Sequence, residues 1–250
     1  QWNLPPIIFL IYRFLVSAYV FGWFVYSLSK SLYFMITLTT WSFLILALHL
    51  LLAFINSSCR VLREKRSCFR RPRDESDPFS LEMAESSCST PERTVDGSEV
   101  DIVSSHTIPW NFKLDWLLYS ICSVAAIMVT TVYYALLFPT GQQAPSVRDI
   151  NVHIMNSVIV FLEILLAAYP VRLLHFIYPV SYGLIYVMFS AIFWSFDPER
   201  NVLYPGVLDW NNPKTTTGMV VGIAVFMIVL HLILYGIFRL KVFLYNRFLI

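Results

Sequence analysis

Six long apolar runs constrain the fold of this chain more than any other feature of its sequence. A helix needs roughly 20 consecutive apolar residues to cross the hydrocarbon core of a bilayer. Only 14% of the residues are charged, whereas a soluble domain carries about a quarter. The sequence therefore predicts an all-α membrane protein, a six-transmembrane-helix bundle that forms one membrane domain over residues 1–250. The helices are expected at about residues 6–28, 33–55, 114–137, 150–168, 175–194 and 217–238.

The distribution of Lys and Arg predicts the orientation of this bundle. An even number of spans places both termini, the polar segment 57–109 and the turn near residue 172 on one side. That side carries Arg60, Arg63, Lys65, Arg66, Arg70, Arg71, Arg73, Arg93, Lys113, Arg172, Arg239, Lys241 and Arg247. The opposite side carries Lys30, Arg148, Arg200 and Lys214. The positive-inside rule then predicts cytoplasmic termini, in the plasma membrane or an endomembrane.

The polar segment 57–109 is predicted to be a disordered cytoplasmic loop, because its acidic, Ser-rich second half has few aromatic residues and no apolar period. Its first part is basic and follows a helix end directly, which predicts contact with anionic membrane lipids. The basic residues are Arg60, Arg63, Lys65, Arg66, Arg70, Arg71 and Arg73. Since they lack interleaved aromatic side chains, no nucleic acid is expected as a partner.

Four polar side chains fall in the half of the helices that is predicted to be nearer the cytoplasm: Arg13, His49, Glu163 and His231. An unpaired charge in a membrane helix costs roughly 2.5–3.5 kcal/mol on insertion scales. We therefore predict an ion pair between Arg13 and Glu163, with both histidines as hydrogen-bond partners. A proton or ion relay would use the same residue types. The helices contain no His-x-x-x-His pair, so neither a metal ion nor another cofactor is predicted.

A second set of polar side chains falls in the outer half of two helices: Thr39, Ser42, His153 and Asn156. A Thr hydroxyl becomes a nucleophile when a neighbouring base, usually His, takes its proton. Thr39 and His153 meet this minimum requirement for catalysis, but no sequence-adjacent signature such as a nucleophile elbow accompanies them. The same four residues also fit a hydrogen-bonded seam between two helices.

Several long motifs resemble the rolling stone family. They are Val-Tyr-Tyr-Ala-Leu-Leu-Phe-Pro at 132–139, Asn-Val-His-Ile-Met-Asn-Ser at 151–157, Tyr-Pro-Val-Arg-Leu-Leu-His-Phe-Ile-Tyr-Pro at 169–179 and Val-Leu-Asp-Trp-Asn-Asn-Pro at 207–213. The resemblance implies a multipass membrane protein that acts in cell–cell interaction or in fusion of the myoblast type, without established catalysis. It does not identify the protein partner. A transporter or channel is less consistent with the sequence, because the sequence has neither the internal repeats nor the helices broken by Gly or Pro that transporters contain.

More distantly, the helix layout is similar to the androgen-induced and androgen-dependent TFPI-regulating proteins, which are intramembrane threonine hydrolases. This likeness implies, as the alternative function, an intramembrane lipid-ester hydrolase with a fatty-acid ester as ligand. Thr39 would then be the nucleophile. The hydrolases carry a His-x-x-His pair whose second His is catalytic. Here His153 matches the first position and Asn156 the second, and a neutral amide cannot accept the threonine proton.

Overall fold

The computed structural model describes residues 5–70, 108–138 and 146–248. Its elements are α1 (Pro6–Lys30), η1 (Leu32–Ile36), α2 (Leu38–Arg70), α4 (Trp110–Val132), η3 (Tyr133–Leu137), α5 (Val147–Asp149), η5 (Ile150–Ile154), α6 (Met155–Leu166), η6 (Leu173–Phe176), α7 (Ile177–Phe196) and α8 (Pro213–Phe248). The described residues contain no strand, and they contain six helices long and apolar enough to cross a membrane. The predicted fold class is confirmed, whereas the side of the membrane that the termini face stays a prediction.

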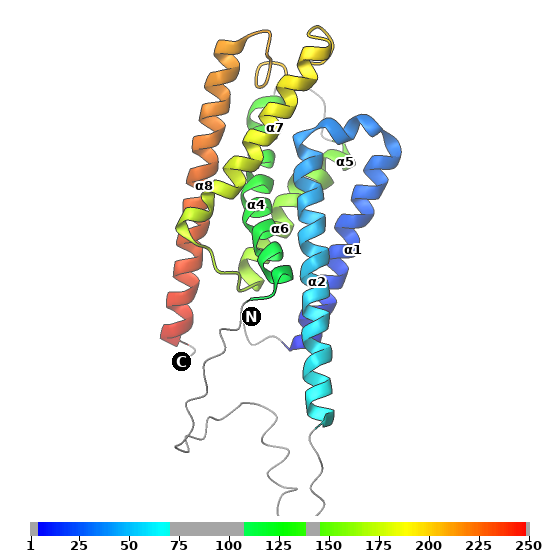
Figure 1. Cartoon of the computed structure of the whole chain (residues 1–250), viewed down its shortest axis with the longest axis vertical. Helices are drawn as coiled ribbons and strands as arrows, with labels where there is room; N and C mark the ends of the chain where they lie inside the picture. The colour runs from blue at the N-terminus through cyan, green and yellow to red at the C-terminus, as the bar shows by residue number, and fades with distance from the viewer. Residues whose placement is uncertain (1–4, 71–107, 139–145, 249–250) are drawn as a thin grey trace, which may run out of the picture.

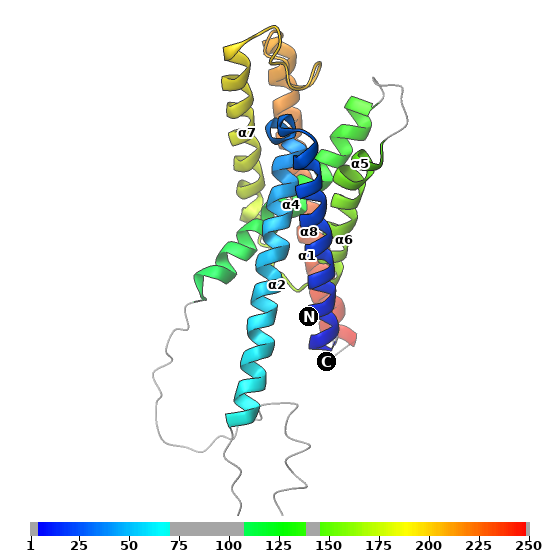
Figure 2. The ribbon, with the colours of Figure 1, turned by 90° about the vertical axis from the view of Figure 1, so that its right-hand side faces the viewer.

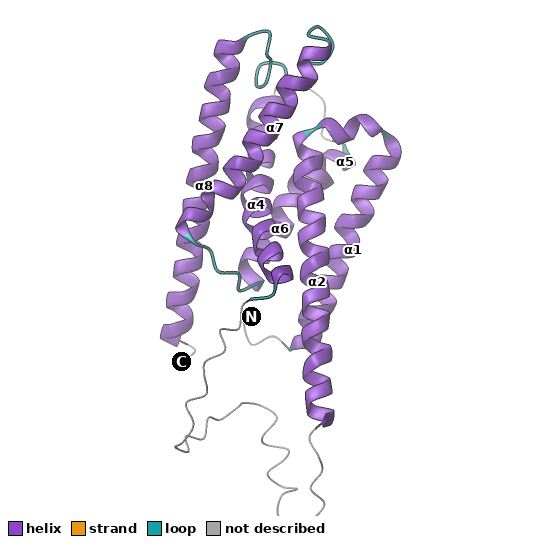
Figure 3. Ribbon diagram, in the orientation of Figure 1, coloured by secondary structure: helices purple, strands orange, loops and turns teal. Residues whose placement is uncertain are grey.

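The two ends of the bundle differ in what they hold (Figure 1). The start of α1, the end of α2 and the end of α8 lie at one end, which we call the terminal end. The turn at 31–37 and the loop that joins α7 to α8 lie at the opposite end, which we call the far end; Figure 3 shows this loop as the longest described connection. Helices α1 and α2 lie side by side in both Figure 1 and Figure 2.

Helix α4 is the centre of the bundle, since it packs against α2, α6, α7 and α8. Its buried face includes the small residues Ser120, Ser123, Ala125 and Ala126. Small side chains let neighbouring helices approach closely, which is how membrane helices gain packing energy when lipid is as apolar as they are. Because α4 runs through the middle, residues near both of its ends contribute to sites described below.

Helix α2 differs most from its predicted bounds of 33–55. It begins at Leu38, because residues 32–36 form the separate 3₁₀ turn η1, and it continues to Arg70. Residues 57–70 are therefore helical and not part of the predicted loop; the rest of that loop, 71–107, lies outside the described residues. No Gly or Pro occurs between residues 56 and 70, and the hydroxyls of Ser57 and Ser58 donate to carbonyls one turn back, at 2.8 Å each.

The remaining boundaries shift by a few residues, except at the end of α8. Helix α4 starts at Trp110 behind Pro109, and α5 starts behind Ser146, whose side chain forms a capping box with Asp149. Helix α8 begins with Pro213, a residue that suits the first helical position. It runs on to Phe248, past the predicted end at 238. The elements η3 and η5 are π-helical turns, which sequence periodicity cannot reveal and which often occur at functional sites.

Candidate functional site

A cavity of about 250 Å³ opens between the far-end parts of α2, α4, α7 and α8. We call it the far-end cavity. Most of its wall is apolar and includes Met128, Val129 and Met227. Gly183 on α7 lies close to Met227 on α8, since a Cβ there would come within 3.3 Å of the Met227 sulfur. An apolar wall with a few polar groups is typical of sites that bind small apolar ligands.

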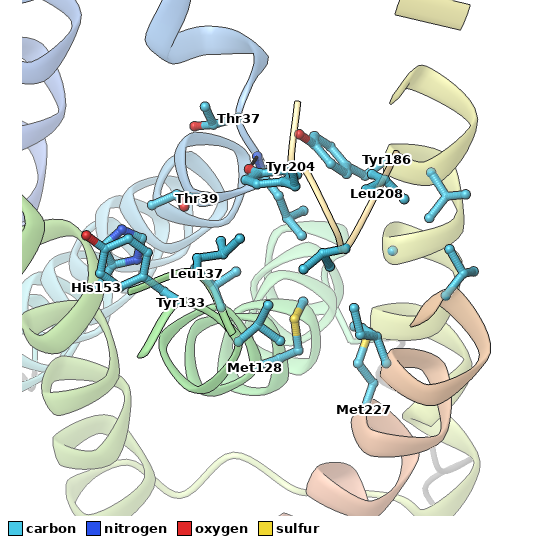
Figure 4. A pocket seen from close by; sticks show the side chains of 18 of the residues that line it. Thr37, Thr39, Met128, Tyr133, Leu137, His153, Tyr186, Tyr204, Leu208 and Met227 are labelled. Atoms are coloured by element: carbon cyan, nitrogen blue, oxygen red, sulfur yellow. Dashed lines mark hydrogen bonds between the residues drawn. The ribbon is translucent and has the colours of Figure 1, made fainter. Parts of the chain in front are cut away.

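The polar part of the wall contains two of the three residues predicted to be catalytic, Thr39 from α2 and His153 from η5 (Figure 4). The Thr39 hydroxyl forms no hydrogen bond within the described part of the chain. No hydrogen bond joins it to His153 there either. Ser42 lies one turn further along α2, but its hydroxyl donates to the carbonyls of Leu38 and Thr39 at 3.0 Å each. The seam predicted between Thr39, Ser42, His153 and Asn156 is therefore not formed by hydrogen bonds among these side chains.

His153 is held by its neighbours in the π-helical turns. Its ring stacks on Tyr133 of η3, with 3.7 Å between centroids and 10° between planes. Thr130 donates to the His153 carbonyl at 2.6 Å and contacts the Ser157 hydroxyl at 2.7 Å. A hydrogen-bonded seam thus joins α4 to the η5–α6 segment, and α2 has no part in it. The His153 Nδ1 atom is buried without a partner among the described residues, so no carboxylate orients this ring as in a catalytic triad.

Asn156, the third predicted catalytic residue, does not line the far-end cavity. Its side chain is fully buried, and neither amide atom has a partner within the described residues. The structure therefore brings Thr39 and His153 to one cavity and leaves Asn156 outside it.

Tyr204 is a wall residue that sequence reasoning missed. Its hydroxyl accepts a hydrogen bond from the backbone N–H of Leu38 at 2.9 Å, directly before Thr39. Tyr204 reaches this position because Gly206 adopts a φ of 79°, which turns the loop back on itself. Burial raises the pKa of the Tyr204 phenol, so the group stays neutral. The sequence signal was the Tyr-Pro-Gly turn at 204–206, which indicates a reversal but not its depth.

A second polar site lies deeper toward the terminal end, and we call it the charge cluster: Arg13, His49, Asp115 and Glu163. The ion pair expected between Arg13 and Glu163 is present, with 2.9 Å between Nη2 and Oε2. His49 lies between the two carboxylates, with Nδ1 2.8 Å from Asp115 and Nε2 3.9 Å from Glu163. All four side chains are at most 4% exposed.

Two tyrosines and an asparagine complete the charge cluster. Tyr12 donates to Glu163 at 2.9 Å, and Tyr169 donates to Asp115 at 2.7 Å. Asn56 donates to the same Asp115 carboxylate at 3.4 Å. Burial raises the pKa of Tyr169 well above its ordinary value, so its hydroxyl remains a donor.

His231 is not a member of the charge cluster, although the sequence placed it there by depth. Its Nε2 lies 3.0 Å from the carbonyl oxygen of Arg172, in the segment before η6. Asp115 occupies the place in the charge cluster that was expected for His231. The predicted start of the helix at residue 114 put Asp115 at the membrane boundary, whereas α4 begins at Trp110 and carries Asp115 into the bundle. Within the described residues no group of three His, Cys, Asp or Glu side chains is arranged to hold a metal ion.

Comparisons with known proteins give the family. The model of the family described as Protein rolling stone matches residues 98–250, which include α4 to α8. Protein rolling stone of Drosophila melanogaster is 31% identical over 137 residues, covering 52% of this chain and 49% of the relative. The chain thus spans about half the length of this curated relative. No solved structure matches the chain. With more than half of its residues matched by the family model and six helices able to span a membrane, the chain belongs to the rolling stone family of multipass membrane proteins.

Proposed function

We propose that this protein acts in cell–cell interaction or in fusion between cells, as the resemblance of its motifs implies. The observation that supports the proposal is a fixed loop between α7 and α8 at the far end. Asn201 donates to the Phe193 carbonyl and Asn211 to the Pro198 carbonyl, both at 2.9 Å. With Tyr204 inserted into the bundle, the loop is held from both sides. A fixed surface binds a partner without the entropic cost of ordering a flexible segment.

The outer part of this loop presents side chains suited to a protein partner. Phe196, the last residue of α7, is 80% exposed, and Glu199 and Arg200 of the loop are exposed near it in the sequence. If the termini face the cytoplasm, this surface faces the outside of the cell or the lumen of an organelle.

The test is a cell-mixing assay with two populations that express the protein and carry different dyes. The double variant Glu199→Ala/Arg200→Ala should reduce aggregation and content mixing at an unchanged amount of surface protein. Arg63→Ala, at the exposed terminal-end side of α2, is the matched control and should leave both readouts unchanged. Equal activity of the loop variant and the unaltered protein would contradict the proposal.

The second candidate function is intramembrane hydrolysis of a lipid ester, and one observation favours it: Thr39 and His153 line the same cavity. In this reaction the Thr39 oxygen attacks the ester carbonyl while His153 accepts the hydroxyl proton. The alcohol then leaves with that proton, and water releases the fatty acid from Thr39. General-base help of this kind is worth roughly 10²–10⁴ in rate. Asn156 takes no part, because it lies outside the cavity.

Fluorophosphonate labelling of the purified protein tests this candidate. Labelling should disappear in Thr39→Ala and persist in Ser42→Ala, since Ser42 donates to its own helix. Asn156→His should leave labelling and cleavage of fatty-acid esters unchanged, because position 156 lies outside the cavity. Absence of labelling in the unaltered protein would rule the hydrolase out and leave a ligand cavity without chemistry.

A further inference from the structure

A second pocket, of about 430 Å³, opens at the terminal end of the bundle, and we call it the terminal-end pocket. Helices α1, α2 and α4 and the segment after α6 contribute to its lining. Its size is that of a pocket for a small ligand, for which roughly 300–1,000 Å³ is usual. It is lined by two arginines, Arg13 and Arg60, whereas the far-end cavity is lined by one, Arg148, together with Asp149.

Arg13 supplies hydrogen-bond donors that the protein does not use. The side chain is 2% exposed, and its Nη2 pairs with Glu163. Its Nε and Nη1 atoms are buried and have no partner among the described residues. The rings of Phe9 and Tyr169, 4.9 and 5.7 Å from the guanidinium carbon, hold the group in place at the pocket wall. Leaving the N–H groups of a buried guanidinium without acceptors is costly. The pocket therefore favours an occupant rich in acceptor oxygens.

The charge around the pocket favours an anionic occupant. Asp115 also lines it, but this carboxylate is already engaged by His49, Tyr169 and Asn56. Arg60 lies one turn after Asn56 on the same face of α2, is exposed, and forms no ion pair within the described part of the chain. The pocket therefore retains an unbalanced positive charge at its mouth.

Two helix beginnings add to this positive character. The first turns of α1 and α4 line the pocket through Pro6, Phe9 and Phe112. Both helices begin behind a proline, Pro5 or Pro109, and neither has a side-chain cap. The N–H groups of Phe9 and Phe112 donate to the carbonyls of Pro5 and Pro109, at 3.2 and 3.1 Å. These ends therefore contribute the positive end of the helix dipole, which attracts anions, and not free N–H groups.

We propose that the terminal-end pocket binds a phosphate group, with Arg13 as the buried ligand and Arg60 at the mouth. Arg13 donates through Nε and Nη1 while Nη2 keeps its ion pair with Glu163. The pocket lies where the membrane spans end, at the level of lipid headgroups. The phosphate belongs either to an anionic phospholipid or to a soluble phosphorylated compound, and the pocket chemistry is the same for both.

Binding of fluorescent phosphatidic acid to the full chain in detergent tests this proposal, with fluorescent diacylglycerol as the probe that lacks phosphate. Phosphatidic acid should bind and diacylglycerol should not. Competition distinguishes the sources: displacement by unlabelled phosphatidic acid alone assigns a lipid, whereas displacement by inorganic phosphate or glycerol phosphate also admits a soluble compound.

Two glutamine variants decide whether the pocket or the general surface charge is responsible. Arg60→Gln should weaken phosphatidic acid binding about tenfold or more, the effect of losing one charge-assisted hydrogen bond. Arg239→Gln removes the same charge from an exposed position of α8 outside the pocket and should change binding little. Arg13→Lys keeps the cation but not the forked donors, and should also weaken binding. Equal losses in the two glutamine variants, or equal binding of both fluorescent lipids, would overturn the proposal.

Discussion

His49 lies at the centre of the charge cluster. It is fully buried, and a carboxylate lies beside each of its ring nitrogens, Asp115 at 2.8 Å and Glu163 at 3.9 Å. Arg13 pairs with Glu163, so His49 is the basic side chain of the cluster that lies against Asp115.

Replacing His49 should therefore cost more stability than replacing the other deeply buried histidine of the bundle, His231. His49→Leu replaces the polar side chain beside the buried Asp115 carboxylate with an apolar one, and taking one partner from a buried charged group costs about 1–3 kcal/mol or more. His231→Leu removes a contact to one carbonyl oxygen, which is worth about 1 kcal/mol. Thermal unfolding of the purified variants in detergent measures both effects. Similar midpoints for the two variants would contradict a special role of His49.

Sequence reasoning found some members of the charge cluster and missed others for a physical reason. The position of a residue along an apolar run gives its depth in the membrane, and depth brought Arg13, His49 and Glu163 together correctly. Depth does not give the direction in which a side chain points, so His231 was placed in the cluster although it contacts Arg172. Thr39 and His153 were matched by depth too, and they line one cavity, whereas Asn156 does not.

At the scale of elements, the ion pair between Arg13 and Glu163 joins α1 to α6. Glu163→Gln should lower the thermal midpoint, because it leaves the Arg13 cation buried without a counter-charge. The double variant Arg13→Met/Glu163→Leu removes both charges and should recover part of the loss, since an apolar pair is tolerated where a single charge is not. Losses that simply add in the double variant would show that the two residues are not coupled.

The helices themselves were predictable to within a few residues wherever a proline or a cap marks their ends, as at Pro109 and Pro213. The end of α2 was not, because the prediction stopped where the apolar run stops. A helix continues beyond the bilayer as long as its residues favour it, and α2 runs on to Arg70 without a helix breaker. The basic residues from 60 to 70 therefore lie on a helix; how they and Arg71 and Arg73 meet anionic lipids stays a proposal.

At the scale of the whole molecule, the two ends of the bundle carry different chemistry. The terminal end holds the charge cluster and a pocket lined by arginines, whereas the far end holds an apolar cavity under a fixed loop. Such an arrangement fits a protein that meets anionic lipid on one side and another protein on the other. Which side is cytoplasmic decides whether the far-end loop can reach a neighbouring cell.

Labelling of single cysteines from outside the cell answers this question. Cys59 is exposed near the terminal end, and Glu199 is exposed in the far-end loop. One variant keeps Cys59 and carries Cys68→Ser and Cys88→Ser. The other carries the same two substitutions together with Cys59→Ser and Glu199→Cys.

Because most Lys and Arg lie on the terminal-end side, an impermeant maleimide should label Cys59 only after permeabilisation. In the second variant it should label position 199 on intact cells if the protein resides at the cell surface. Cys122, common to both variants, is 1% exposed and provides the unlabelled background. Labelling of Cys59 on intact cells would reverse the orientation and place the far-end loop in the cytoplasm, where it could not contact another cell.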